Sequence, residues 1–337
     1  MSDLIVAADL RWPKGTGIGV CATEYLARLP VDMSSCALQL RSGIGHPISP
    51  LELGARLALH QKKHQVFWNP GFVPPAWSRA PSVVTVHDLT HLHYYSSLHV
   101  RYYNTVFRPM YRRCSAVVCV SEYTRSEFLD WSGMDPGQVH VVHNGVSSRF
   151  HAHVEPHRPG YPYILYPGNM RSYKNVEMLL RAFTQSSLRA LGLKVVLTGT
   201  GTPELLATIA ALGIAEHVVF LGFVPDERLP GLYRGASFTA FISLYEGFGL
   251  PIVESMAVGT PVLTSNVSSM PEIAGDAAVI VQPRDLGEIA NAMDRLVSDS
   301  ALRVDLVAKG LERAATFSWD RAATQAWGIV RSAARQR

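Results

Sequence analysis

Short strand-like segments alternate with amphipathic segments along most of the chain, and this alternation constrains the fold more than any other feature. The strand-like segments are short and mostly rich in β-branched residues: Leu4–Ala8, Gln65–Trp68, Ser82–Val86, Ala116–Val120, Val139–Val142, Tyr163–Tyr166, Lys194–Thr198, Val218–Leu221, Phe238–Ile242, Pro261–Thr264 and Ala278–Val281. The amphipathic segments between them include Gly17–Leu29, Leu98–Arg113, Val176–Phe183, Pro203–Ala211 and Leu286–Val297. Strands that alternate with helices form parallel sheets covered by helices on both faces, so the sequence predicts an α/β protein.

The alternation restarts near Tyr163, after a His-, Pro- and Gly-rich stretch at 151–162 that is typical of a linker. A chain of 337 residues is also long enough for two domains, and 47% apolar residues with 17% charged ones exclude a disordered chain. The sequence therefore predicts two doubly wound, Rossmann-like domains, residues 1–155 and 156–315, with an interdomain cleft between them.

The composition also limits the compartment and the partners. No window approaches 18 uninterrupted apolar residues and the start lacks a basic region, which predicts a cytoplasmic protein. The four cysteines fit no zinc spacing and are expected to be buried free thiols. Residues 1–150 hold 14 basic and 10 acidic residues and so carry the whole net charge of +4, which indicates an anionic partner for this half but is too small to indicate nucleic acid.

In open parallel sheets ligands bind beyond the carboxyl ends of the strands, so the loops that follow strands are the ones to examine. Gly15-Thr-Gly-Ile-Gly19 precedes the first expected helix and indicates either a phosphate loop or a simple helix-entry turn. His87-Asp88 ends a strand; His87 can donate to a sugar or phosphate oxygen with Asp88 orienting it, or Asp88 caps a turn.

A third loop, Tyr166 to Asn175, contains Arg171 and Lys174. Asn175 is expected to be the N-cap of the following helix, which places Lys174 at a strand-to-helix turn where a cation meets an anionic ligand such as a diphosphate. The alternative is a solvated lysine. A fourth loop, Thr198-Gly-Thr-Gly201, indicates a tight turn, beside a ligand or purely structural.

The fifth loop carries most of the functional information. Glu246 follows a strand, Pro251 suits the first turn of a helix, and Glu254 lies one turn inside that helix. The intervening Gly247-Phe248-Gly249 leaves a helix N-terminus for a phosphate, with a carboxylate on either side. A nucleotide sugar has hydroxyls on both sides of a diphosphate, which such an arrangement fits better than two solvated glutamates.

These residues resemble the signature of the family-4 retaining glycosyltransferases of the GT-B fold. The central match is Glu246-Gly-Phe-Gly-Leu-Pro-x-x-Glu254 followed by Gly259-Thr-Pro-Val. Further matches cover nearly the whole chain: Gly17-Ile-Gly19, Thr85–Asp88, Val120–Glu122, Val142–Gly145, Phe220–Val224, Ser269–Asp276 and Phe317–Trp319. The last implies that residues 316–337 form a C-terminal helix packing back toward the N-terminal domain.

The resemblance implies roles for particular residues. Glu246 would hold hydroxyls of the donor sugar, Glu254 the ribose, and Lys174 the diphosphate leaving group, assisted by backbone amides. His87 would contact the sugar near the reacting centre and so completes a catalytic set with Glu246 and Lys174. The expected donor-side residues are Gly17, Asn169, Arg171, Lys174, Gly199, Phe223, Val224, Glu246, Gly247, Phe248, Gly249, Leu250 and Glu254. The expected acceptor-side residues are Gly19, Asp88, Ser121 and Glu122.

One departure from the family concerns the diphosphate. Many members carry an arginine right after the glycine of the third loop or just before the lysine, where this chain has Asn169 and Tyr173. Arg171 is the candidate replacement. Since no Asp-x-Asp is present, no metal or other cofactor is expected.

The resembling subgroup implies a donor and an acceptor. It is frequent among bacterial mannosyltransferases of exopolysaccharide and O-antigen assembly, so GDP-mannose is the first expected donor and UDP-glucose or another nucleotide hexose the second. The acceptor would be a growing glycan, soluble or linked to polyprenyl diphosphate, and transfer would retain the anomeric configuration without a covalent intermediate.

A lipid-linked acceptor predicts contact with the inner face of the plasma membrane. Segment 98–113 interleaves arginines with aromatic residues, which suits an anionic lipid surface; a packed helix with solvated arginines is the alternative. Two other classes of protein fit the sequence less well. The glycine pattern of a Rossmann dehydrogenase is absent from this sequence. A non-catalytic nucleotide-sugar sensor would be expected to lose His87-Asp88 and Gly17-Ile-Gly19, and both are intact here.

Overall fold

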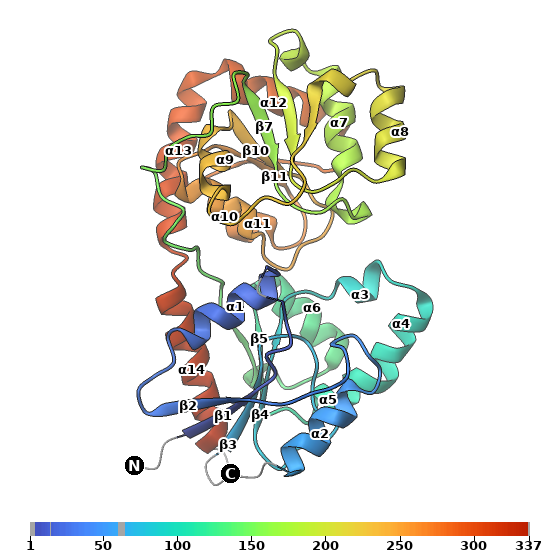
Figure 1. Cartoon of the computed structure of the whole chain (residues 1–337), viewed down its shortest axis with the longest axis vertical. Coiled ribbons are helices and arrows are strands. Elements are labelled where there is room, and N and C mark those ends of the chain that lie inside the picture. Colours follow the sequence, from blue (N-terminus) through green and yellow to red (C-terminus); the bar gives the residue numbers. More distant parts are fainter. Residues whose placement is uncertain (1–3, 14, 60–64, 336–337) are drawn as a thin grey trace. The chain divides into compact units, whose positions relative to one another are not determined.

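The computed structural model describes residues 4–13, 15–59 and 65–335, which form two compact units (Figure 1). Unit 1 comprises Met1–Gly145 with Ser318–Arg337, and unit 2 comprises Val146–Phe317. The first boundary therefore lies earlier than the 155–156 expected from the sequence, and the second lies at 317–318 rather than 315–316. The reason is that the linker-like stretch packs on unit 2, where the His157 N–H donates to the Gly231 carbonyl at 2.8 Å.

Unit 1 is built on a sheet of six strands in the order β2-β1-β3-β4-β5-β6, and all neighbouring pairs are parallel. Its strands are β1 (Leu4–Ala8), β2 (Met33–Ala37), β3 (Gln65–Asn69), β4 (Ser82–Val86), β5 (Ala116–Cys119) and β6 (Val139–Val141). Its helices are α1 (Gly17–Leu26), α2 (Ser49–Leu59), α3 (Thr90–His93), α4 (Ser97–Tyr102), a π-helical turn (Tyr103–Phe107), α5 (Arg108–Tyr111), α6 (Glu122–Ser132), a 3₁₀ turn (Pro136–Gln138) and α14 (Trp319–Arg335).

The pleat of this sheet sends alternate residues into two separate cores. On one face Val6, Ala8 and Trp68 pack with Tyr25 of α1 and Trp327 of α14. The other face is covered by α2, α5 and α6 and has its own apolar cluster. The terminal helix α14 thus belongs to the core of unit 1, although it follows unit 2 in the chain (Figure 1).

Unit 2 repeats the plan with the order β12-β11-β10-β7-β8-β9, again parallel throughout. Its strands are β7 (Tyr163–Tyr166), β8 (Lys194–Leu197), β9 (Val218–Phe220), β10 (Phe238–Phe241), β11 (Val262–Ser265) and β12 (Val279–Val281). Its α-helices are α7 (Val176–Gln185), α8 (Pro203–Ala211), α9 (Leu229–Gly235), α10 (Leu250–Ala257), α11 (Met270–Ala274), α12 (Leu286–Ser298) and α13 (Ser300–Ala315). Three 3₁₀ turns complete it: Ser172–Lys174, Ser187–Arg189 and Ala215–His217.

One face of this second sheet forms a large core with α7, α8 and α12, in which Phe183, Ile209 and Met293 are buried. On the other face α10 is tied to the sheet by a hydrogen bond of 2.7 Å from Ser255 Oγ to Thr239 Oγ1. The strand order reverses between β7 and β10, so the loops that leave these two strands come together at one edge of the sheet.

Every strand expected from the sequence is present, with ends that differ by at most one residue. The strand β2 was missed because Met33–Ala37 contains no β-branched residue and is an exposed edge strand. The expected helix at 98–113 is interrupted by the π-helical turn at Tyr103–Phe107. Of the four expected buried thiols, Cys36 is half-buried while the other three are buried.

Candidate functional site

An ion pair stands where the strand order of unit 2 reverses. Lys174 lies in the loop after β7 and Glu246 in the loop after β10, and Lys174 Nζ lies 2.5 Å from Glu246 Oε1. The two side chains are only 12% and 14% exposed. Both residues were predicted from the sequence to face a ligand. The ion pair between them was not predicted.

Within the part of the chain that the structure describes, one oxygen of the Glu246 carboxylate accepts all of its hydrogen bonds. Ser243 Oγ donates to Oε1 at 2.6 Å, alongside the Lys174 ammonium. Oε2 accepts no hydrogen bond from any described residue. A carboxylate held firmly by one oxygen with the other oxygen open is arranged to accept hydrogen bonds from a ligand's hydroxyl groups.

The two loops that carry the pair are joined by their backbones. The Leu244 N–H donates to the Tyr173 carbonyl at 2.7 Å, and Asn175 Nδ2 donates to the carbonyls of Ile242 (3.1 Å) and Pro283 (2.7 Å). Asn175 is the N-cap residue of α7, as expected, but its side chain makes no capping hydrogen bond. This side chain is used across the sheet edge instead, and the residue adopts a left-handed conformation.

The helix α10 begins directly after the Glu246 loop, with Pro251 in its first turn as expected. Gly249 precedes it at φ +107°, a conformation that a residue with a side chain adopts only with strain. Phe248 is buried against Phe317, with ring centroids 5.6 Å apart. The loop Gly247–Gly249 and Leu250 thus lie at a rigidly defined helix N-terminus, where anions are stabilised.

Glu254 lies on α10, where Tyr233 Oη donates to its Oε2 at 2.6 Å. Burial raises the pKa of Glu254 to about 7, against the opposing effect of the Tyr233 hydrogen bond. Its Oε1 has no partner among the described residues. Tyr233 was not anticipated from the sequence, because nothing in the pattern of α9 indicates which carboxylate its hydroxyl would meet.

The glycine turn expected after Thr198 lies next to Gly222. Gly199, at φ +93°, and Gly222 exchange backbone hydrogen bonds of 2.7 and 3.1 Å, which join the loops after β8 and β9. Phe223 follows this bridge with 87% of its surface exposed, and Val224 is half-buried. An exposed aromatic ring on a fixed turn is suited to stack against a nucleobase.

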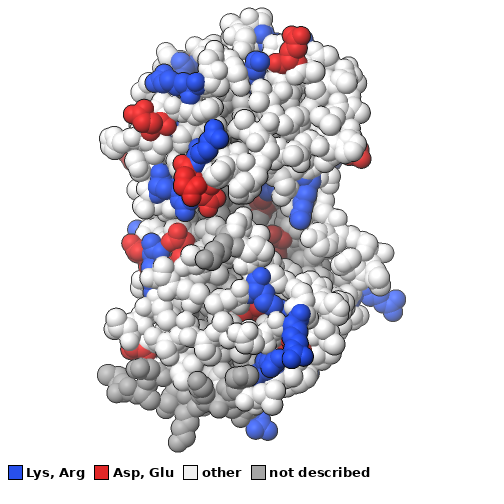
Figure 2. All heavy atoms as spheres, in the orientation of Figure 1, with Lys and Arg blue, Asp and Glu red and all other residues white. Residues whose placement is uncertain are grey.

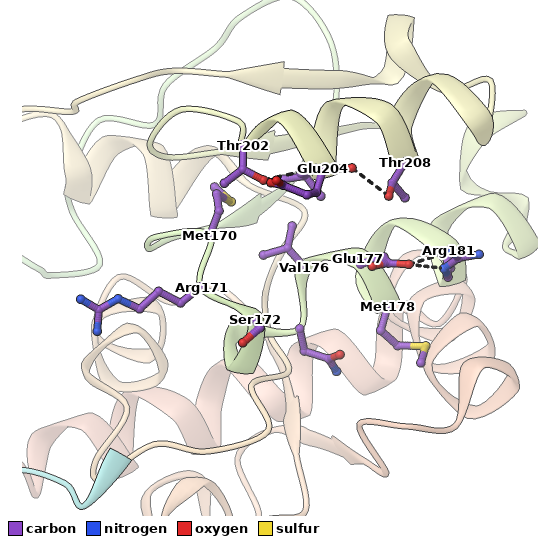
Figure 3. Close-up of a pocket in the computed structure, with 12 residues that line it drawn as sticks. Met170, Arg171, Ser172, Val176, Glu177, Met178, Arg181, Thr202, Glu204 and Thr208 are labelled. Atoms are coloured by element: carbon purple, nitrogen blue, oxygen red, sulfur yellow. Dashed lines mark hydrogen bonds and ion pairs between the residues drawn. The ribbon is translucent and has the colours of Figure 1, made fainter. Parts of the chain in front are cut away.

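Arg171 and Asn169 lie on the loop that leads to Lys174. Asn169 Oδ1 accepts the Arg171 N–H at 3.2 Å, and both residues are exposed. Arg171 also borders a cavity of about 560 Å³ at the first turns of α7 and α8 (Figure 3). Lys174, Glu246 and Glu254 are not part of its lining, and Glu177 in it pairs with Arg181 at 2.7 Å. This cavity is therefore distinct from the ion-pair site.

In unit 1 the strand order reverses between β1 and β3, and a buried charged pair that was not expected from the sequence lies there. Asp9 is completely buried and accepts from Arg11 Nε at 2.8 Å and from Arg11 Nη2 at 2.7 Å. Asn69 Nδ2 is 3.3 Å from Asp9 Oδ2, and the guanidinium also donates to Ser42 and Ser49. The position of Asp9, an acidic residue directly after the predicted strand Leu4–Ala8, was the one sequence feature that could have indicated this pair.

His87 lies at the end of β4, and its orientation differs from the expected one. His87 Nε2 is 2.7 Å from the Pro70 carbonyl and donates to it, so Pro70 rather than Asp88 orients the ring. Burial lowers the pKa of His87, which favours the neutral ring with Nδ1 as an acceptor. Asp88 Oδ1 instead accepts the Thr90 N–H at 2.8 Å, which is the turn-capping alternative.

The other residues expected in unit 1 lie at helix starts. Thr16 caps α1 by accepting the Gly19 N–H, and Gly17 begins that helix with no neighbouring atom within 4 Å of where a Cβ would lie. Packing therefore does not explain the glycine at 17. Ser121 is buried and caps α6, while Glu122 is exposed in its first turn.

The arginines of segment 98–113 hold local backbone. Arg112 Nε donates to the Ser132 carbonyl at 2.7 Å, and Arg113 Nη1 to the Ala76 carbonyl at 3.3 Å. Tyr103, Phe107 and Tyr111 are buried in the core of unit 1. The packed-helix alternative thus describes most of this segment.

Charges on the face in Figure 2 are interspersed, with both signs present and wide neutral areas between them.

Within 4–13, 15–59 and 65–335, no three His, Cys, Asp or Glu side chains gather as metal ligands. No helix in these same ranges is both long and apolar enough to cross a bilayer.

Two family models match the chain. "Glycosyl transferases group 1" matches residues 148–313, and "Glycosyltransferase Family 4" matches residues 47–150. The O-antigen chain mannosyltransferase B of Escherichia coli is 32% identical over 285 residues, which are 80% of this chain and 74% of that protein.

Solved structures show the same fold. The sucrose-phosphate synthase of Thermosynechococcus elongatus superposes with a TM-score of 0.78 at 19% identity, covering 98% of both chains. HepE from Anabaena, solved in complex with UDP and glucose, superposes with a TM-score of 0.75 at 18% identity, covering 98% of this chain and 100% of HepE. The fold is GT-B.

Proposed function

Because the chain belongs to the group 1 and family 4 glycosyltransferases, we propose that it transfers mannose from GDP-mannose to a growing glycan with retention of configuration. The observation that carries this proposal is the Lys174–Glu246 pair at the reversal of strand order, in which Glu246 Oε2 has no hydrogen-bond partner among the described residues. Glu254, one turn into the next helix, offers a second open carboxylate oxygen. Two such oxygens on either side of a helix N-terminus match the sugar, diphosphate and ribose of a nucleotide sugar.

Charge development at the leaving group supplies the catalytic argument. Breaking the bond between sugar and phosphate places negative charge on the diphosphate and positive charge on the sugar. The Lys174 ammonium and the backbone amides at the start of α10 stabilise the negative charge on the diphosphate. Glu246 stabilises the sugar by accepting hydrogen bonds from its hydroxyl groups. Arg171, exposed on the same loop as Lys174, supplies the second cation that the diphosphate needs.

No nucleophile is assigned to the protein in this mechanism. The acceptor hydroxyl attacks the face from which the diphosphate departs, and the leaving group takes the proton. His87 is neutral with Nε2–H committed to Pro70, so it contributes Nδ1 as an acceptor for a sugar hydroxyl. Mass spectrometry of enzyme quenched during turnover tests this step, because a glycosylated side chain would overturn it.

The choice of donor rests on similarity. The relative named an O-antigen chain mannosyltransferase supports mannose and, through the subgroup's usual donor, GDP. The solved relative with UDP and glucose supports UDP-glucose as the alternative. Thermal shift with GDP, UDP, ADP and NAD separates the two, since a ligand stabilises the fold in proportion to the logarithm of its concentration over its Kd. Stabilisation by UDP alone would move the donor to UDP-hexoses.

A sensor that binds a nucleotide sugar without turning it over is the candidate from another class. In unit 1, His87-Asp88 and Gly17-Ile-Gly19 are intact, which favours an enzyme, because a sensor needs only the residues of unit 2. Release of nucleoside diphosphate in the presence of acceptor glycans decides between them. Tight binding without release under any acceptor would favour the sensor.

We also propose that unit 1 contacts anionic lipid, as a polyprenyl-linked acceptor would require. Tyr95 is 46% exposed and Leu98 is 74% exposed, and Arg101 nearby is exposed as well. Aromatic and aliphatic side chains beside a cation suit the interface of an anionic bilayer. Vesicle flotation tests this: loss of binding in Leu98→Ala with Arg101→Ala is expected, and no binding by the wild type would remove the idea.

A further inference from the structure

Two residues with left-handed backbone lie beside the ion pair of unit 2. Among the described residues, Asn175 and Ser268 are the only non-glycine residues with positive φ, at +60° and +53°. Asn175 directly follows Lys174, and Ser268 Oγ accepts the Glu246 N–H at 3.0 Å. Asparagine adopts this conformation readily, whereas serine does so only with strain, which persists when the surroundings require it.

The segment that contains Ser268 holds the Glu246 loop with three serine hydroxyls. Ser265 Oγ donates to the Ser243 carbonyl at 2.7 Å. Ser269 Oγ lies 2.9 Å from the Glu246 carbonyl and 3.0 Å from the Phe248 carbonyl. Together with the bond from the Glu246 N–H to Ser268, these contacts fix the peptide groups on both sides of Glu246.

Fixing both peptide groups fixes the direction of the side chain between them. Glu246 Oε1 is already held by Lys174 and Ser243, so the backbone decides where the open Oε2 points. Ser265 and Ser269 are fully buried and have ordinary backbone, which makes them general supports of the fold. Ser268 is half-buried and strained, and it binds Glu246 itself.

We propose that Ser268 is a positioning residue that orients the Glu246 side chain toward the donor sugar. Its Oγ accepts the Glu246 N–H, and the left-handed backbone of Ser268 maintains this hydrogen bond. This inference rests on the proposed function of Glu246. Removing the hydroxyl should misplace Oε2 by a fraction of an ångström while leaving the diphosphate and base contacts in place, so transfer should suffer and nucleotide binding should not.

Three substitutions separate the hydroxyl from the strain. Ser268→Gly removes both, so kcat should fall about 10-fold while Tm is equal to or above that of the wild type. Ser268→Ala removes only the hydroxyl, so the same loss of kcat should come with a lower Tm. Ser268→Thr keeps a hydroxyl at a backbone that disfavours β-branching, so kcat should be largely restored although Tm falls. Ser187→Ala, which removes an exposed hydroxyl bonded to Asp294 Oδ1, is the control and should change neither.

The outcomes also separate this inference from the proposed function. If Glu246→Gln abolishes transfer but Ser268→Gly and Ser268→Ala keep the wild-type kcat, the inference is wrong and the function stands. A loss of kcat matched by an equal loss of GDP affinity would reduce Ser268 to a structural support and would likewise overturn it. If Glu246→Gln transfers normally, the proposed role of Glu246 itself fails.

Discussion

Each sheet places a carboxylate and a cation where its strand order reverses, yet the two pairs differ in what they leave open. In unit 1, Asp9 is completely buried and both of its oxygens are bound, by Arg11 and Asn69. In unit 2, Glu246 is 14% exposed, and among the described residues only its Oε1 has hydrogen-bond partners. The first pair has no remaining capacity for a ligand, whereas the second keeps an acceptor for one.

This difference suggests a structural role for the Asp9–Arg11 pair and a ligand-binding role for the Lys174–Glu246 pair. A buried pair with every hydrogen bond made organises the loops around it, because breaking it would leave an uncompensated charge. In unit 1 the Arg11 guanidinium reaches the Ser42 carbonyl and Ser49 Oγ, and so fixes the chain before α2. The chemistry of transfer is therefore expected from unit 2, with His87 and the start of α1 as the contributions of unit 1.

The largest expected effect is on the open pair. Glu246→Ala should lower transfer by about 10³-fold, since it removes both the acceptor for the sugar hydroxyls and the partner of Lys174. Binding of GDP should be largely retained, because the diphosphate meets Lys174 rather than the carboxylate. Steady-state kinetics and calorimetric titration with GDP measure the two quantities.

Glu177→Ala is the matched control for that variant. Glu177 pairs with Arg181 at 2.7 Å in the same unit, but the pair is exposed and spans one helical turn. Such pairs contribute little, so transfer and stability should both stay near those of the wild type. Equal losses in Glu177→Ala and Glu246→Ala would mean that the ion-pair site has no special role.

The closed pair should respond through stability. Asp9→Ala leaves the Arg11 guanidinium buried without its partner and should lower the free energy of unfolding by about 3 kcal/mol. Urea denaturation measures this, and GDP affinity of the remaining folded protein should be unchanged. Asp226→Ala, which breaks an exposed pair with Arg149, should cost less than about 1 kcal/mol. An Asp9→Ala protein with the unfolding free energy of the wild type would contradict the structural role of the Asp9–Arg11 pair.

The sequence predicted the architecture well because hydrophobic periodicity determines where parallel strands and covering helices form. It failed at Met33–Ala37, where an edge strand of small and polar residues buries little and gives no periodic signal. It also placed the linker at 151–162, although that segment packs against α9 through contacts that only the folded chain brings together.

The candidate site was predicted in part. The residues Lys174, Glu246 and Glu254 follow from loop position and family resemblance, but their partners do not. Tyr233 lies 21 positions from Glu254 in the chain, and Ser268 lies 22 positions from Glu246. Such contacts depend on how loops from different strands meet, which a single sequence does not encode locally. The same reason explains why the sequence left two roles open for Asp88, of which the structure shows the turn-capping one.

A pH series distinguishes Glu254 from the ionised carboxylates. Its pKa is raised from 4.5 to about 7 in the folded protein, so the folded state binds the proton more tightly than the unfolded state. Its contribution to stability is therefore fully present below about pH 4.5 and is lost as the pH rises to about 7. The total change is at most about 3 kcal/mol.

Glu254→Gln isolates this contribution, because an amide oxygen still accepts from Tyr233 but does not titrate. The difference in unfolding free energy between wild type and variant should change between pH 4.5 and 7 and be constant above that range. GDP should also bind the wild type more tightly as the pH rises through 7, since ribose hydroxyls donate to the ionised form. A difference that is constant across the series would mean that Glu254 has an ordinary pKa.

The smallest expected effect is at the exposed ring of Phe223. Stacking of a base on an aromatic side chain is worth on the order of 1 kcal/mol, so Phe223→Ala should weaken GDP binding about 10-fold. The value of kcat should stay unchanged, because the ring is expected to touch the base and not the reacting sugar. Val304→Ala, at a side chain that is 71% exposed on α13, controls for removing exposed apolar surface. Unchanged GDP affinity in Phe223→Ala would place the base elsewhere and would confine the ligand-binding part of unit 2 to the open carboxylates and the start of α10.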